Sequence, residues 1–189
     1  MQSDNLMEDI AEILITPEEL KARVAELGAQ ISADYAGKNP LLVGVLRGVF
    51  VFMADLVRAI TIPIGVDFIG ITSYDPTSRD RGVVRFTKDL EVCIEGRHVL
   101  FVEDVIDTGL TLRYILRSLS TRRPASLRVC VLFDKPRIRL FDLHIDYTGF
   151  VLPDKFVVGY GLDYHEQYRN LPFVGVLKKE IITRGNLSF

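Results

Sequence analysis

Apolar residues recur along the first part of the chain with two different spacings, and each spacing predicts a different kind of element. From residue 17 onward they fall every three or four positions, as on one face of a helix, at Leu20, Val24, Leu27, Ile31 and Tyr35. This helix is expected to end near Gly37 and to begin at a capping box with proline at the first helical position, Thr16-Pro17-Glu18-Glu19. The uninterrupted apolar run that follows, residues 41–46, is too short for a helix and is typical of a strand covered on both faces.

The middle of the chain predicts two strand–helix–strand units. Helices are expected at residues 49–60 and 110–121, and strands at residues 64–71, 83–86, 98–102 and 127–133. Parallel strands joined through a helix form right-handed crossovers, so we expect an α/β fold with a mainly parallel twisted sheet flanked by helices. Between the units, residues 72–82 are polar and aperiodic and contain Pro and Gly, which predicts a mobile loop that acts as a lid.

Both ends of the chain lack this regular alternation. The first 15 or so residues are acidic and helix-like, and beyond Asp134 short strand candidates stand at about 156–158 and 173–177 among prolines and aromatics. We therefore expect a single domain over residues 1–189, with its core at about 16–150. The two ends, about 1–15 and 150–189, are expected to form a small hood packed against the sheet.

Composition narrows the class of protein without pointing to a reaction. The 189 residues are 48% hydrophobic, which suits one globular domain, and 23 basic against 25 acidic residues leave a net charge of -2. That balance provides no basic excess for nucleic acid or anionic lipid, and the longest apolar runs are far shorter than a membrane helix. Because the N-terminus lacks a signal-peptide pattern, we expect a cytoplasmic protein in which Cys93 and Cys130 are buried, reduced thiols.

The strongest chemical signal is the string Val-Leu-Phe-Val-Glu-Asp-Val-Ile-Asp-Thr-Gly-Leu-Thr at residues 99–111. It delivers Glu103, Asp104 and Asp107 at the carboxyl end of a buried strand, where open α/β sheets bind ligands. The turn that follows, residues 108–111, offers backbone N–H groups at a helix N-terminus and predicts a phosphate cradle. It is not a Walker A loop, and the acids suit a diol or a divalent cation, so a sugar monophosphate fits better than ATP. Taken alone, Asp107 is equally well explained as a helix cap.

This string is similar to the phosphoribosyl diphosphate signature of class I phosphoribosyltransferases. The rest of the chain resembles the branch of that family that acts on 6-oxopurines, with matches at residues 45–50, 73–74, 134–136, 153–164 and 169–172. The block at 153–164 reads Pro-Asp-Lys-Phe-Val-Val-Gly-Tyr-Gly-Leu-Asp-Tyr, and it discriminates best because the signature alone marks only the superfamily. The resemblance therefore extends over most of the chain and implies the class I phosphoribosyltransferase fold.

The resemblance implies that the signature binds the ribose and 5'-phosphate of the donor, through Glu103, Asp104, Asp107, Thr108, Gly109, Leu110 and Thr111. Asp107 would also be the catalytic residue, because a carboxylate within reach of purine N7 can hold the proton of the base. Leu110 stands where lysine is common in the family. A cradle built mainly from backbone N–H groups and threonine hydroxyls should tolerate that difference.

The resemblance assigns the purine to the last third of the chain. Lys135 would donate to the 6-oxo group and thereby exclude adenine, which carries a donor amine at that position. Phe156 would stack on the base, and the backbones of Val157 and Asp163 would lie at its edge. The purine-binding residues are therefore expected to be Lys135, Phe156, Val157 and Asp163.

Pyrophosphate is assigned by the same resemblance to two other segments. Arg47 and Gly48 would form one side of its site, with a cis peptide bond before Arg47, and Arg169 would form the other. Arg47 stands where many relatives have lysine, and either cation can pair with pyrophosphate. Ser73 and Tyr74 would belong to the lid that excludes water during transfer.

The reaction implied is purine salvage: transfer of the 5-phosphoribosyl group from phosphoribosyl diphosphate to N9 of hypoxanthine or guanine, giving IMP or GMP and pyrophosphate. Mg²⁺ is the implied cofactor, with Glu103, Asp104 and, at a second site, Asp163 as ligands. We expect small-molecule substrates, no nucleic-acid or membrane partner, and a homodimer or homotetramer as in relatives. Two alternatives stay open: an enzyme of this family that prefers xanthine, and an RNA-binding pyrimidine-type regulator on the same fold, which the net charge of -2 disfavours.

Overall fold

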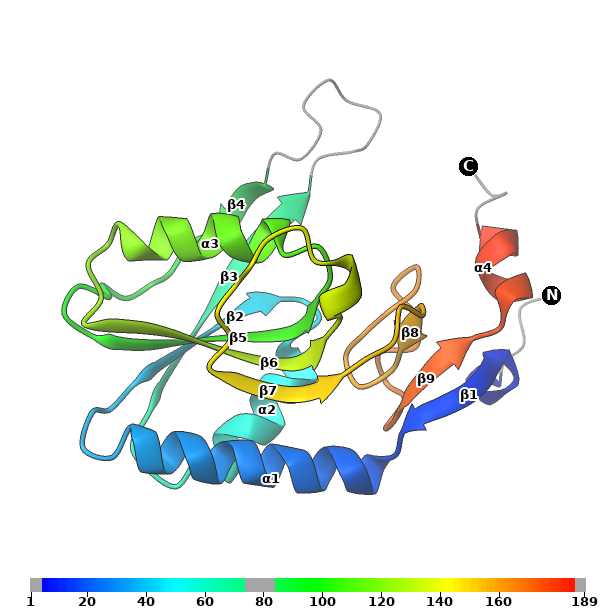
Figure 1. The fold of residues 1–189 in the computed structure, drawn as a ribbon, viewed down its shortest axis with the longest axis horizontal. Coiled ribbons are helices and arrows are strands. Elements are labelled where there is room, and N and C mark those ends of the chain that lie inside the picture. The colour runs from blue at the N-terminus through cyan, green and yellow to red at the C-terminus, as the bar shows by residue number, and fades with distance from the viewer. Residues whose placement is uncertain (1–4, 74–83, 186–189) are drawn as a thin grey trace.

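A computed structural model describes residues 5–73 and 84–185. It contains a six-stranded sheet with helices on both faces and a smaller three-stranded sheet at one end (Figure 1). In the order β4-β3-β2-β5-β6-β7, the large sheet comprises β4 (Val84–Lys88), β3 (Gly65–Ser73), β2 (Leu41–Leu46), β5 (His98–Ile106), β6 (Ser126–Asp134) and β7 (Tyr147–Val151). All of its neighbouring strands are parallel except β3 and β4, which are antiparallel. The predicted α/β fold with a mainly parallel sheet is therefore confirmed.

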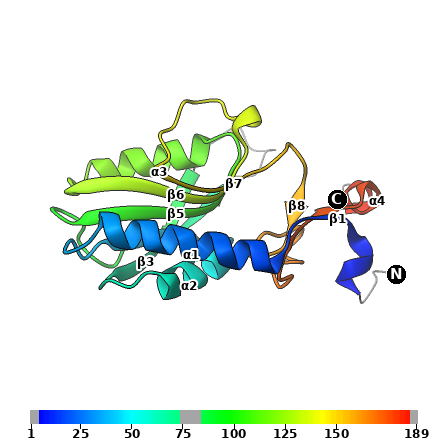
Figure 2. The ribbon, with the colours of Figure 1, turned by 60° about the horizontal axis from the view of Figure 1, so that its bottom comes forward.

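The helices cover the two faces of this sheet unequally. Figure 2 shows α1 (Pro17–Asp34) and α2 (Phe50–Ala59) on one face and α3 (Leu110–Ser120) on the other. The first helix begins at the predicted capping box: Glu19 N–H donates to Thr16 Oγ1 at 3.3 Å, and Thr16 N–H donates to the Glu19 carboxylate at 2.8 Å. Two apolar clusters, one on each face, bury the sheet on both sides, which explains why its strands are continuous apolar runs.

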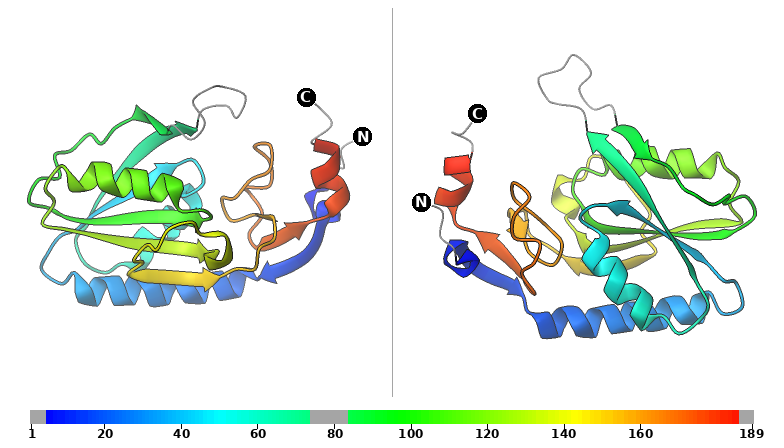
Figure 3. Two further views of the ribbon diagram at one scale, coloured as in Figure 1. Left: turned by 45° about the horizontal axis from the view of Figure 1, so that its top comes forward. Right: turned by 180° about the vertical axis from the view of Figure 1, so that it is seen from behind.

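The hood is built from both ends of the described chain. Its sheet has the order β1-β9-β8, with antiparallel pairs throughout, from β1 (Ile10–Ile15), β9 (Val174–Leu177) and β8 (Val157–Val158). The 3₁₀ turn η1 (Leu6–Asp9) precedes it and the helix α4 (Lys179–Gly185) follows it. Figure 3 shows β1 running into the start of α1, so this helix joins the hood to the large sheet.

Several expectations about local structure were wrong. The first 15 residues are not helical throughout, because Ile10–Ile15 pairs with β9 and this distant partner decides its conformation. Strand β7 was not predicted, and β5 continues beyond residue 102 to Ile106 because its ladder with β6 extends that far. A short 3₁₀ turn, η2 (Pro136–Ile138), follows β6.

The two cysteines are both free thiols but differ in environment. Cys130 is buried in β6, and burial raises the pKa of its thiol well above the ordinary value. Cys93 is exposed, so the expectation that it is buried was wrong. The reason is that residues 91–94 lie in the irregular connection between β4 and β5 rather than in a strand.

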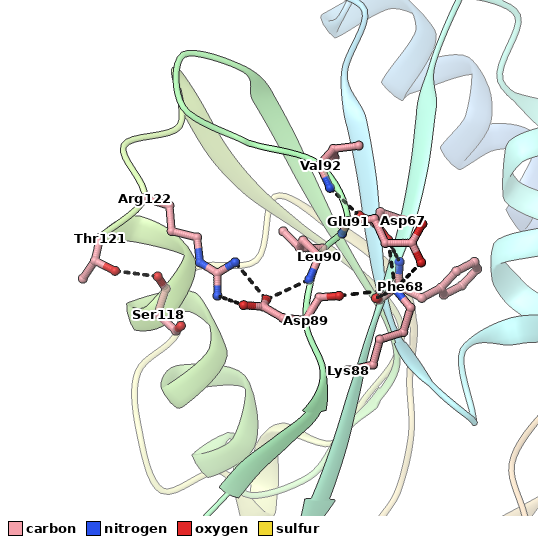
Figure 4. A network of polar contacts seen from close by, with 10 residues as sticks. All are labelled: Asp67, Phe68, Lys88, Asp89, Leu90, Glu91, Val92, Ser118, Thr121 and Arg122. Atoms are coloured by element: carbon pink, nitrogen blue, oxygen red, sulfur yellow. Dashed lines mark hydrogen bonds and ion pairs between the residues drawn. The ribbon is translucent and has the colours of Figure 1, made fainter.

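A polar network fixes that connection to the sheet (Figure 4). The buried Asp67 carboxylate on β3 accepts hydrogen bonds from the backbone N–H groups of Phe68 and Glu91, both at 2.7 Å, and pairs with Lys88 at 3.4 Å. Asp89, which follows Lys88, pairs with Arg122 just beyond α3 at 2.8 Å. The network thereby holds the start of the β4–β5 connection against two elements.

Among the described residues, no helix combines the length and the apolar character needed to cross a membrane. The longest, α1, has buried residues on one side only, at Leu20, Val24, Leu27, Gly28 and Ile31. Its amphipathic pattern is that of a helix lying on a sheet.

Candidate active site

The carboxyl ends of β2 and β5 lie side by side in the centre of the large sheet. Gly44 of β2 is paired with Val102 of β5, so the turn after Leu46 lies next to the acids that begin at Glu103. The Leu46–Arg47 peptide bond is cis, as the resemblance implied. In open α/β sheets this edge is where ligands bind, and two of the predicted segments therefore meet there.

Gly48 is packed directly against Asp104. A Cβ built on Gly48 would overlap the Asp104 carboxylate, with its Cγ only 2.9 Å away. On the other side, a Cβ on Gly161 would overlap the Gly48 carbonyl oxygen, and Gly161 has φ +98°. The backbone at Gly48 thus packs against the Asp104 side chain on one side and against the backbone at Gly161 on the other, and the two glycines permit the approach.

The predicted phosphate cradle lies at the start of α3. A cavity of about 170 Å³ is lined there by residues that include Glu103, Asp107, Thr108, Gly109 and Thr111. Gly109 is the N-cap residue and has φ +79°, a backbone conformation that favours glycine. The free N–H groups of the first helical turn and the positive end of the helix dipole suit an anion in this cavity.

The Leu110 side chain does not line this cavity. Its side chain is 50% exposed, and only its backbone N–H approaches the cradle, at 3.5 Å from Thr108 Oγ1. The backbone carbonyl of Thr108 accepts a hydrogen bond from Leu140 N–H at 3.0 Å, which ties the cradle to the segment after β6. The start of α3 is therefore supported by backbone contacts that do not involve the Leu110 side chain, and phosphate binding there stays a prediction.

The acids of β5 occupy different environments. Burial raises the pKa of Glu103 well above its usual range, with a further contribution from the neighbouring Asp104 charge. Burial also raises the pKa of Asp104 to about 6, opposed by backbone hydrogen bonds and by the Arg169 charge. Asp107 is exposed and pairs with the buried Lys135 ammonium at 3.3 Å. The predicted proton acceptor and the predicted 6-oxo donor are thus brought together.

The predicted pyrophosphate residues belong to a second group of charges. Arg169 Nη2 pairs with Asp163 Oδ1 at 2.7 Å, and its Nη1 donates to the Gly161 carbonyl at 2.8 Å. Arg47 Nη2 pairs with Glu166 Oε1 at 2.7 Å, and Glu166 Oε2 lies 3.5 Å from Arg169 Nη2. Glu166 therefore links Arg47 to Arg169.

The aromatic residue predicted to stack on the base lies in the connection leading to the hood. The Phe156 side chain is 44% exposed, and its ring meets that of Tyr164 edge-on at a centroid distance of 5.4 Å. Val157 is buried and paired with Val176 in the hood sheet. Phe156 is thus partly exposed and packs against Tyr164, and its stacking on the base stays a prediction.

The lid prediction falls largely outside the described residues. Ser73 is the last residue of β3, and Tyr74 lies beyond it, in the part of the chain that the structure does not describe. The lid at residues 72–82 therefore stays a prediction. The division of the single domain into a core at about residues 16–150 and a hood from the two ends also stays a prediction.

Comparison with known proteins identifies the family. A family model described as "Phosphoribosyl transferase domain" matches residues 10–165. The chain belongs to the phosphoribosyl transferase family. A hypoxanthine-guanine phosphoribosyltransferase of Streptococcus agalactiae is 48% identical over 95% of this chain and 99% of its own.

Solved structures of phosphoribosyltransferases have the same fold as this chain. A hypoxanthine phosphoribosyltransferase from Staphylococcus aureus superposes with a TM-score of 0.89 at 42% identity, covering 95% of this chain and 98% of its own. The Trypanosoma cruzi hypoxanthine phosphoribosyl transferase gives a TM-score of 0.90 at 40% identity, covering 96% and 98%. The likeness includes the hood as well as the large sheet, since nearly all of each chain is covered.

The acids of this phosphoribosyl transferase fit a hard divalent cation. Glu103 Oε2 is buried and accepts no hydrogen bond from the described residues, and the Asp104 carboxylate follows it in the strand. Carboxylate oxygens of this kind are the ligands that Mg²⁺ prefers. Asp163 is paired with Arg169 at 2.7 Å, and its role as ligand at a second Mg²⁺ site stays a prediction.

Two features of the site were missed by reasoning from the sequence. Glu166 was not singled out, because an isolated acid in a loop has no local pattern that links it to Arg47, 119 positions away. The buried ion pair between Arg139 and Asp134 also went unpredicted; it braces the segment that carries Lys135. The only available signal was position in the sequence: Glu166 lies between two family motifs, and Asp134 belongs to one.

Proposed function

We propose that this chain transfers the 5-phosphoribosyl group from phosphoribosyl diphosphate to N9 of hypoxanthine or guanine, giving IMP or GMP and pyrophosphate. The observation that carries the proposal is the pairing of Asp107 with Lys135 at 3.3 Å beside the cradle at the start of α3. The names of the similar proteins, hypoxanthine-guanine and hypoxanthine phosphoribosyltransferase, support the same substrates.

The base is selected by the donor and acceptor pattern of this pair. The buried Lys135 ammonium carries only donors, so it matches a 6-oxo group and is opposed to the amino group of adenine. A buried charge without a matched partner costs about 3 kcal/mol or more. This cost is enough to reject adenine by more than a hundredfold. Phe156 stacks on the purine, and the backbones of Val157 and Asp163 meet its edge in this proposal.

Transfer itself requires a proton to leave the base and negative charge to leave with pyrophosphate. The bond from N9 to C1 of the ribosyl group forms as the bond from C1 to the pyrophosphate oxygen breaks. As N9 bonds to C1, the Asp107 carboxylate accepts the proton that leaves purine N7, while Arg47 and Arg169 neutralise the departing phosphates. The cradle at Thr108–Thr111 keeps the 5'-phosphate in place throughout.

Mg²⁺, held by Glu103 and Asp104, would supply positive charge that binds the ribose hydroxyls and the pyrophosphate. Its carboxylate ligands must be ionised to bind it, and burial disfavours their ionisation in the protein alone. Cation binding and deprotonation of this acid pair are therefore coupled.

The test is an initial-rate assay with phosphoribosyl diphosphate and Mg²⁺, in which hypoxanthine, guanine, xanthine, adenine and uracil are supplied separately. We expect pyrophosphate release and nucleotide formation with hypoxanthine and guanine, and loss of both in the Asp107→Asn variant. Preferential turnover of xanthine would move the assignment to the alternative within the family. Uracil turnover, or nucleotide binding without turnover of any base, would contradict the proposal.

A cytoplasmic homodimer or homotetramer completes the proposal. The free thiols of Cys93 and Cys130 support a reducing compartment. This assembly is what the resemblance to dimeric and tetrameric relatives implies. Light scattering coupled to gel filtration checks the assembly, and a monomer at micromolar concentration would overturn this part.

A further inference from the structure

Glu166 occupies both arginines that the proposed function assigns to pyrophosphate. Its Oε1 lies 2.7 Å from Arg47 Nη2 and its Oε2 lies 3.5 Å from Arg169 Nη2. These three side chains line a common cavity of about 310 Å³ together with Leu46 and Phe50. The carboxylate therefore takes up N–H donors that a phosphate group in this cavity would need.

The backbone of Glu166 is fixed while its side chain is accessible to solvent. Its φ is +64°, which a residue with a side chain adopts only where neighbouring contacts impose it, and its N–H donates to Asp163 Oδ2 at 2.9 Å. The side chain is 56% exposed and that of Arg47 is 69% exposed. An ion pair so open to water is weak, so the Glu166 carboxylate can give up its partner at little cost.

The Asp163 carboxylate is less exposed to solvent than the Glu166 carboxylate. Its carboxylate pairs with Arg169 at 2.7 Å and also accepts the Glu166 N–H, and both Asp163 and Arg169 have side chains less than one-third exposed. Asp163 is therefore the less exposed of the two carboxylates that contact Arg169. Glu166 is the carboxylate whose contact with the cationic pair is open to exchange.

We propose that Glu166 is an exchangeable counter-ion for Arg47 and Arg169: it yields the two guanidinium groups to pyrophosphate and takes them back as pyrophosphate leaves. By competing with the product for the same N–H donors, it lowers the affinity for pyrophosphate and speeds its release. This inference rests on the proposed function. Glu166 acts through the arginines and is thus a positioning residue rather than a catalytic one.

Replacing the carboxylate by a neutral amide of the same shape tests this inference. In the Glu166→Gln variant the cationic pair loses its competitor, so pyrophosphate should bind about two- to fivefold more tightly, the range that an exposed ion pair is worth. Binding is measured by titration calorimetry with pyrophosphate and MgCl₂, and as product inhibition against phosphoribosyl diphosphate. If release of pyrophosphate limits turnover, both kcat and the KM for phosphoribosyl diphosphate should be lower in Glu166→Gln than in the wild type.

Glu95→Gln is the matched control. Glu95 Oε1 pairs with Arg123 Nη2 at 2.7 Å, and its side chain is 55% exposed, so the contact and the exposure equal those of Glu166 at a place remote from the site. Its pyrophosphate affinity should equal that of the wild type. A general effect of charge on anion binding would instead strengthen binding in both variants, and that result would overturn the inference.

A double variant shows whether the effect passes through Arg47. In an Arg47→Ala background, Glu166→Gln should change pyrophosphate affinity by less than it does in the wild-type background. Unchanged or weaker pyrophosphate binding by Glu166→Gln in a folded protein would refute the counter-ion role. If the wild type forms no nucleotide at all, the proposed function fails, and this failure is distinguishable because it is seen before any variant is made.

Discussion

Substituting Gly48 by alanine tests the closest approach in the site. The added methyl would lie 2.9 Å from Asp104 Cγ and would overlap the carboxylate oxygen itself. Carbon atoms in favourable contact are about 3.5–4.0 Å apart, so the turn or the carboxylate must shift by about 1 Å. Asp104 is buried and Gly48 is held from behind by the backbone at Gly161, which leaves little room for a costless adjustment.

A displacement of about 1 Å between reacting groups costs on the order of a hundredfold in rate. We therefore expect Gly48→Ala to lower kcat/KM for phosphoribosyl diphosphate by about this factor. The measurement is a steady-state assay of IMP formation at saturating hypoxanthine, accompanied by circular dichroism and a thermal melt. The fold should be retained, because the clash is confined to one edge of the sheet.

Gly65→Ala provides the control for this substitution. At Gly65, the first residue of β3, the added methyl would meet only ends of flexible side chains, Leu41 Cδ1 at 3.0 Å and Arg97 Nη2 at 3.2 Å. Its kcat/KM should remain within about twofold of the wild type. If Gly48→Ala is folded and as active as Gly65→Ala, then the contact with Asp104 does not position the donor, and the reasoning is refuted.

Three further outcomes test other residues. Lys135→Met removes the buried donor, and kcat/KM for hypoxanthine should fall by about 10- to 100-fold, the value of a charged hydrogen bond, in the initial-rate assay. Asp67→Asn sets an amide against the N–H donors that the carboxylate accepts, so calorimetry should show a loss of about 2–4 kcal/mol, or a Tm lower by about 4–16 °C. Burial alone would raise the pKa of Asp67, but hydrogen bonds from Glu91, Phe68 and Lys88 hold it below the usual value. The stabilisation from Asp67 is therefore present above about pH 4 and lost as pH falls through the lowered pKa. Denaturant titrations between pH 3 and 7 should show that the free energy of unfolding decreases more steeply with acid in the wild type than in Asp67→Asn.

Regular elements of the large sheet were predictable because their signals are local. The capping box at Thr16 and the continuous apolar runs of β2, β5 and β6 each specify an element without reference to the rest of the chain. Strand β1 carries no such signal. Its residues become a strand by pairing with β9, which lies at the far end of the chain, and a tertiary partner of this kind leaves no periodic pattern in a short segment.

Residues of the candidate site also divide into those with a local sequence signal and those placed by distant contacts. The cradle and its acids come from one contiguous string, so the sequence predicted their placement at a strand end, and the cis bond before Arg47 was implied by family resemblance. Glu166 joins Arg47 through a loop whose conformation depends on several residues with positive φ, including His165 and Tyr168. Side-chain pairing between two such loops is decided by tertiary geometry and cannot be found from spacing.

The arrangement of the hood determines when the site can form during synthesis. Its sheet closes only when β9 pairs with β1, which are the last and first strands of the described chain, whereas β2 to β7 can pair before β9 has been made. The segment that carries Arg169 lies between β8 and β9, so its position becomes fixed only after this late pairing. Domains generally fold as units, so a nascent chain that ends before β9 lacks the strand that holds the Arg169 segment in place. An incomplete chain would hold the sheet and its acids but remain inactive.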